Sequence, residues 1–85
     1  MSKYEKAKER ILKKPKDYTY TEAKYLLGKM GFLEYHKGKT SGSRVCFYRE
    51  RDKRVIMLHK PHPGDEMVRG SVVDLVEYLK CIGEL

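Results

Sequence analysis

The sequence predicts a two-layer α+β protein, a three-stranded antiparallel sheet with helices on one face. Two amphipathic segments precede three short strand-like segments, and a third amphipathic segment closes the chain. Turns rich in glycine, serine and charged residues separate the strands, which favours an antiparallel meander. With 85 residues, 40% of them hydrophobic, the chain is long enough for one folded domain and no more.

The first helix is expected from about Lys3 to Lys13. Its apolar side chains recur at helical spacing on one side, at Tyr4, Ala7 and Ile11. Pro15 stops it, because the residue before a proline avoids the helical conformation. We therefore divide the chain into a basic helical extension, residues 1–17, and the main part of the single globular domain, residues 18–85.

A second helix is expected to start near Thr19. Thr19 and Glu22 have the spacing of a capping box, in which the hydroxyl and the carboxylate each bond a free backbone amide. Gly31 stands where a left-handed cap would end the helix. The apolar stripe between these ends consists of Ala23, Leu26, Leu27 and Met30.

Three strands follow, over residues 32–37, 43–49 and 54–58. Strand side chains alternate between faces, so we expect Val45 and Phe47 to pack against the helices. Arg44 and Tyr48 then face solvent. The last helix is expected over residues 71–81, capped by Ser71 with Asp74 and ended by Gly83. Its apolar stripe consists of Val72, Leu75, Val76, Leu79 and Ile82.

Positive charge is concentrated between Lys37 and Lys60. This segment holds eight Lys or Arg residues and two acids, a net charge of +6 out of +7 for the chain. Basic residues interleaved with aromatics on a small sheet are typical of a protein that binds a polyanion such as RNA. We expect one continuous positive patch made of Lys37, Lys39, Arg44, Arg49, Arg54 and Lys60.

Other classes of site are disfavoured. Cys46 and Cys81 each lie in an apolar stretch, which indicates two buried thiols in a reducing compartment. No Cys or His pair has metal-ligand spacing, so neither a metal nor another cofactor is expected. No apolar run approaches the length of a membrane span, and the N-terminus lacks a signal-peptide core. We therefore expect a cytoplasmic protein with no membrane partner.

A set of short motifs resembles one known family. They are Gly31-Phe32 closing a helix, Gly42-Ser43 opening a strand, Val55 to His59 ending a strand in histidine, and Gly70 to Gly83 as the closing helix. In their order and spacing, residues 19–85 resemble the HicA toxins of HicA–HicB toxin–antitoxin pairs. The resemblance implies a double-stranded-RNA-binding-domain-like fold and an mRNA endoribonuclease that a HicB-like antitoxin silences. Arg44 stands where this family has its catalytic histidine.

Metal-free RNA cleavage needs a base for the 2′-hydroxyl and an acid for the leaving oxygen, and histidine suits both tasks. His59 matches a family position, so the resemblance implies a catalytic role; its alternative is a histidine that caps a strand end. Arg44 stays protonated and can act only as an electrostatic helper that grips phosphate. Tyr48 can stack on a base. The predicted RNA-binding residues are Lys37, Lys39, Ser43, Arg44, Tyr48, Arg49, Arg54 and Lys60.

Two alternatives stay open at this point. The first keeps the fold and removes the chemistry, leaving a catalytically inactive RNA-binding module. The arginine at position 44 favours it. The second is a small protein-interaction domain whose positive face binds an acidic partner. A steep dependence of RNA affinity on salt separates RNA binding from this last alternative.

Overall fold

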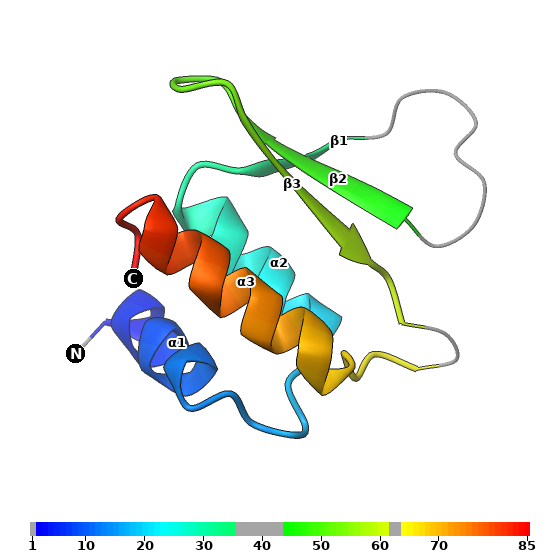
Figure 1. Cartoon of the computed structure of the whole chain (residues 1–85). Coiled ribbons are helices and arrows are strands. Elements are labelled where there is room, and N and C mark those ends of the chain that lie inside the picture. Colours follow the sequence, from blue (N-terminus) through cyan, green and yellow to red (C-terminus); the bar gives the residue numbers. More distant parts are fainter. Residues whose placement is uncertain (1, 36–43, 62–63) are drawn as a thin grey trace.

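The computed structural model of the chain describes residues 2–35, 44–61 and 64–85. In these residues it confirms the predicted α+β architecture, with three helices and a three-stranded antiparallel sheet. The elements in chain order are α1 (Lys3–Leu12), α2 (Tyr20–Lys29), β1 (Leu33–Tyr35), β2 (Arg44–Arg49), β3 (Arg54–His59) and α3 (Arg69–Cys81). The helices lie on one side of the sheet, and α1 packs against α2 and α3 (Figure 1).

The sheet has the strand order β1-β2-β3, so β2 is central and the other two strands are edges. Both pairs are antiparallel, which confirms the predicted meander. Phe47 lies at the centre, opposite Glu34 on β1 and Ile56 on β3. Val45 and Phe47 are buried against the helices, as the alternation of strand side chains predicts.

The predicted start and end of α2 are confirmed. The Thr19 hydroxyl accepts a hydrogen bond from the Glu22 N–H at 3.1 Å, and the Glu22 carboxylate accepts one from the Thr19 N–H at 3.2 Å. Gly31 follows the helix with φ of +98°. A Cβ at Gly31 would also lie 3.3 Å from Cδ of Arg49, so both the backbone conformation and the space favour glycine there.

All helices and two of the strands contribute to one core. Ile11 of α1 has no exposed surface and belongs to the same cluster as the buried residues of α2 and α3. Each member of the core predicted from the sequence is buried, namely Val45, Phe47, Leu75, Val76 and Leu79. The N-terminal helix is therefore packed into the fold through its predicted apolar side.

The predicted cap of α3 is wrong. The helix begins at Arg69, and the residue at its N-cap is Val68, which makes no side-chain capping bond. Ser71 already lies inside the first turn, where its N–H bonds the Val68 carbonyl at 3.0 Å. Ser71 and Asp74 have the spacing of a capping box, but Ser71 lies three residues after the true N-cap, Val68.

Candidate nucleic-acid interface

The outer face of the sheet carries the side chains that alternate with the buried ones. Exposed large apolar residues occupy much of it, with Leu33, Tyr35, Val55 and Met57 between 46% and 72% exposed. Cys46 and Tyr48 complete the middle of this face and are partly buried. We define the outer face by its residues Leu33, Tyr35, Arg44, Cys46, Tyr48, Val55, Met57 and His59.

Arg44 and His59 meet at one end of the outer face. They are directly opposite each other in the β2–β3 register, and both are exposed. Side chains of directly opposed residues in an antiparallel pair have Cβ atoms about 4.5–5.5 Å apart. Lys60, also exposed, follows immediately. The fold thus puts a guanidinium and an imidazole side by side, with Lys60 next in the chain, and all three residues were predicted for the RNA site.

The middle of the outer face is apolar, a feature that the sequence analysis did not predict. Tyr35 and Tyr48 lie diagonally across β1 and β2, because Tyr35 is opposite Cys46. With Cys46 and Val55 they line a shallow hollow of about 290 Å³. Aromatic rings on an exposed sheet can stack on unpaired bases. Alternating hydrophobicity in the strands is the sequence signal from which this hollow could be predicted.

Arg49 does not lie on an exposed patch, which corrects the prediction. Its side chain is 3% exposed, and its guanidinium lies over the Phe32 ring at 4.6 Å from the centroid. Asp52 accepts from Nε at 3.0 Å and from Nη2 at 2.7 Å. Nη1 donates to the Met30 carbonyl at 3.1 Å and to Glu84 at 2.9 Å. With its donors engaged inside the fold, Arg49 holds the structure together and does not face a ligand.

The predicted continuous patch is divided in the part of the chain that the structure describes. Arg54 lies at the start of β3, and His59 lies at its end. In the strand register Arg54 is opposite Arg49, and its Nε donates to Asp52 at 3.0 Å. A strand of six residues separates these ends by about 17 Å. Arg44, His59 and Lys60 form one cationic end, and Arg54 belongs to the other. The predicted residues Lys37, Lys39 and Ser43 lie outside the described residues.

The Arg49–Asp52 pair predicts a pH dependence of stability. Hydrogen bonds from Arg49 lower the pKa of the Asp52 carboxyl from 3.8 to about 2. A carboxyl with a lower pKa in the folded state stabilises the fold above pH 3.8 and loses this effect as the pH falls towards 2. The thermal midpoint of Asp52→Asn should therefore fall less steeply than that of the wild type between pH 4 and pH 2.

The control for this measurement is Arg51→Met. Arg51 lies in the same turn and binds Glu84 at 3.1 Å. Replacing it leaves Asp52, Arg49 and Arg54 unchanged. Its thermal midpoint should keep the wild-type slope against pH. Parallel curves for Asp52→Asn and the wild type would contradict the role of this carboxyl.

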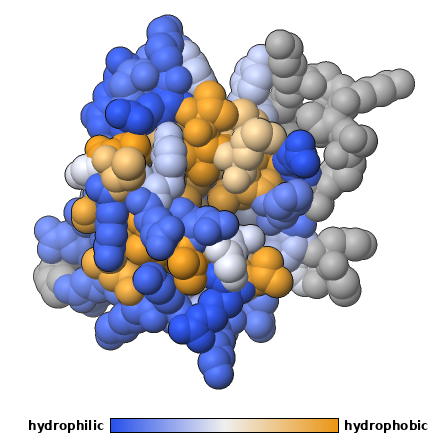
Figure 2. All heavy atoms as spheres, viewed as in Figure 1, coloured by the Kyte–Doolittle hydropathy of each residue, from blue (hydrophilic) through white to orange (hydrophobic). Residues whose placement is uncertain are grey.

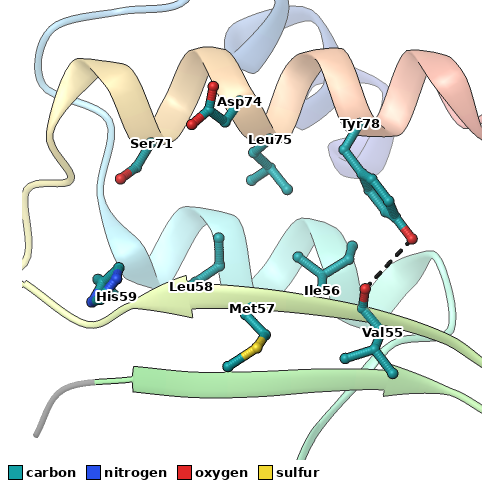
Figure 3. Close-up of a pocket in the computed structure, with 9 residues that line it drawn as sticks. All are labelled: Val55, Ile56, Met57, Leu58, His59, Ser71, Asp74, Leu75 and Tyr78. Atoms are coloured by element: carbon teal, nitrogen blue, oxygen red, sulfur yellow. Dashed lines mark hydrogen bonds between the residues drawn. The ribbon is translucent and has the colours of Figure 1, made fainter.

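A groove separates edge strand β3 from α3 (Figure 3). It encloses about 370 Å³ and is lined by Val55, Ile56, Met57, Leu58, His59, Ser71, Asp74, Leu75 and Tyr78. His59 therefore borders both the outer face and this groove. The helix residues of the groove were not predicted as site residues, because the sequence does not show which helix turns face a strand edge.

Among the residues that the structure describes, no group of three or more His, Cys, Asp or Glu side chains could hold a metal ion. No helix in the same residues is long and apolar enough to cross a membrane. The prediction of two buried thiols is wrong, since Cys46 is half-buried on the outer face and Cys81 is exposed.

Comparisons with protein-family models, with curated proteins and with solved structures found no match to this chain. The HicA resemblance and its double-stranded-RNA-binding-domain-like fold therefore stay predictions. The candidate site depends on the geometry of the outer face, above all on the opposition of Arg44 and His59.

Proposed function

We propose that the protein is an RNA-binding toxin of the HicA type, an mRNA endoribonuclease that binds its substrate at the Arg44–His59 end of the sheet. The cross-strand opposition of Arg44 and His59 carries this proposal. It puts a guanidinium, which can bind phosphate, and an imidazole, which can transfer protons, side by side on exposed surface. The surrounding segment, residues 37–60, holds +6 of the net charge of +7, which favours a polyanionic ligand.

The two side chains suit different parts of a metal-independent cleavage. The His59 imidazole removes the proton of a ribose 2′-hydroxyl, whose oxygen then attacks the adjacent phosphorus. The bond from phosphorus to the 5′-oxygen of the next nucleotide breaks, and that oxygen takes a proton from water. The Arg44 guanidinium donates to the phosphate oxygens and stabilises the charge that develops on them. Tyr48 holds an unpaired base on the outer face by stacking. RNA is the substrate that this chemistry requires, because DNA lacks the 2′-hydroxyl.

The order of elements supports a HicA-type assignment. A helix, three meandering strands and a closing helix occur in that order in α2, β1, β2, β3 and α3, as the resemblance requires. The proposal places the protein in the cytoplasm with mRNA as target and a HicB-like antitoxin as partner. A binding-only relative is the second candidate, because arginine replaces the family's catalytic histidine at position 44.

The proposed RNA site is tested by comparing two single-charge removals. Arg44→Ala should weaken RNA binding more than Lys6→Ala, because Arg44 lies beside His59 while Lys6 lies on α1. Each lost phosphate contact should lower the slope of log affinity against log salt by about 1. Fluorescence anisotropy with labelled RNA at several salt concentrations measures both quantities.

Equal losses from both substitutions would indicate diffuse charge attraction and contradict the site. An RNA affinity that does not change with salt would instead favour the protein-interaction domain. Binding with a normal salt slope and no cleavage would favour the binding-only candidate.

A further inference from the structure

Edge strand β3 leaves backbone hydrogen-bonding groups open. The carbonyl of Val55 accepts a hydrogen bond from the Tyr78 hydroxyl at 3.5 Å, and it points away from β2 (Figure 3). In an antiparallel strand, every second residue directs its N–H and C=O to the same side. Met57 and His59 therefore direct theirs to the free edge, while Ile56 and Leu58 bond β2. Among the described residues, neither Met57 nor His59 has a backbone partner outside the sheet.

Among the residues that the structure describes, the middle of this edge lacks the usual protection against pairing. Exposed edge strands are normally blunted by charges, proline, bulges or a covering segment. Here the exposed side chains beside the open groups are apolar, with Val55 46% and Met57 56% exposed. Apolar surface gathers over β3 in the space-filling view, with hydrophilic side chains around it (Figure 2). The strand is thus suited to pairing with a further strand.

The groove between β3 and α3 provides space for that strand. Its floor is formed by the buried side chains of Ile56, Leu58 and Leu75. Tyr78 closes one end by its bond to Val55, and His59 stands at the other (Figure 3). A strand paired with β3 would direct alternate side chains into this groove and the others over the outer face.

A second copy of the chain fits this edge poorly. In an antiparallel pair of two β3 strands centred on Met57, Arg54 of each copy lies opposite Lys60 of the other. Like charges directly opposite each other are destabilising. Each copy also carries a net charge of +7, so the whole molecules repel.

An acidic ligand complements the same charges. At the Arg54 end, three arginines share two carboxylates, because Asp52 pairs with Arg49 and Arg54 while Glu84 pairs with Arg49 and Arg51. Lys60 has no ion pair with a described residue at the other end. Asp74 lines the groove between the two ends, which restricts acidic side chains of a ligand to its termini.

We propose that β3 and α3 form a binding groove for an extended acidic segment of another protein, which joins the sheet as a fourth strand. The bound segment runs antiparallel to β3. Its first, third, fifth and seventh residues face Lys60, Leu58, Ile56 and Arg54, with acids at the ends and aliphatic side chains between. Its second and fourth residues bond the backbone of His59 and Met57, and its sixth accepts from the N–H of Val55, whose carbonyl is bonded by the Tyr78 hydroxyl. The proposal does not depend on RNA binding.

The test uses a heptapeptide with glutamate at both ends, valine and leucine at positions three and five, and threonine elsewhere. We expect saturable binding that shifts the amide resonances of Met57 and His59. Methylating the backbone nitrogen of the fourth peptide residue removes one strand bond and should weaken binding about tenfold. Met57→Pro removes the matching edge N–H, which bonds nothing in β2, and should have a similar effect. Met57→Ala keeps the N–H, so it should bind the peptide more tightly than Met57→Pro does.

Four results would overturn the proposal. The first is the absence of amide shifts in β3 when the heptapeptide is added. The second is unchanged affinity for the methylated peptide, a test that leaves the protein unaltered. The third is equal affinity for a peptide with lysine in place of both glutamates, which would reject an acidic occupant. A concentration-dependent dimer of the free wild type that Met57→Pro dissociates would also overturn it, because a second copy would then occupy the edge.

Discussion

His59→Ala is expected to abolish RNA cleavage by the purified protein, and Arg44→His is expected to raise it. General acid–base groups typically contribute about 10²–10⁴-fold to a rate. Arg44 is directly opposite His59, so histidine at position 44 would place a second imidazole beside the first. One imidazole can then deprotonate the 2′-hydroxyl while the other protonates the leaving 5′-oxygen. Gel assays of RNA decay in the presence of a chelator measure the three proteins side by side.

Lys6→Ala serves as the control for charge, because it removes one cation from α1 and leaves the outer face intact. It should cleave at the wild-type rate. Undiminished cleavage by His59→Ala would reject His59 as the proton-transfer group. No cleavage by the wild type, together with normal RNA binding, would establish the binding-only candidate, and Arg44→His would then test whether the missing imidazole is the reason.

Phe47→Ala is expected to destabilise the fold by about 3–5 kcal/mol, a large part of the stability of a domain this size. Phe47 is 1% exposed at the centre of the sheet, and its ring lies 6.2 Å from that of Tyr20 in a tilted arrangement. Truncation would leave a cavity between the sheet and α2. The matched control is Met57→Ala on the outer face of β3, which should change the free energy of unfolding little because Met57 is 56% exposed.

Urea denaturation of the two variants and the wild type gives the free energies of unfolding. Equal midpoints for Phe47→Ala and the wild type would contradict the assignment of Phe47 to the core. A large loss in Met57→Ala would mean that the outer face is covered in solution, since truncating an exposed side chain has little effect on packing.

Most of the fold could be predicted because its local signals agree with one another. The capping box of Thr19 and Glu22, the left-handed Gly31 and the alternation through Val45 and Phe47 each specify the same elements. The same alternation places Arg49 on the buried face, since it is two residues beyond Phe47. The prediction of an exposed Arg49 was wrong because it rested on the charge of the residue and not on its position in this alternation.

The candidate site was harder to predict because it depends on register and on contacts between distant segments. The residues around Arg44 and His59 in the sequence do not determine that the two are directly opposite. A shift of the strand pairing by two residues would keep every side chain on the same face of the sheet. The acids that bury Arg49 come from a turn and from Glu84, 35 positions away in the chain. Likewise, the groove requires the placement of α3 beside β3, which a one-dimensional pattern does not specify.

The carboxylate of Glu22 has a consequence for how the molecule opens. It accepts hydrogen bonds from the Thr19 backbone at 3.2 Å and from Nη2 of Arg10 at 3.2 Å, so one side chain serves the first turn of α2 and the docking of α1. Detachment of α1 would break this link as well as uncover Ile11. The two helices should therefore exchange their amide hydrogens as one cooperative unit, and α1 should not fray independently of α2. By this measure the basic N-terminal helix is an integral part of the folding unit.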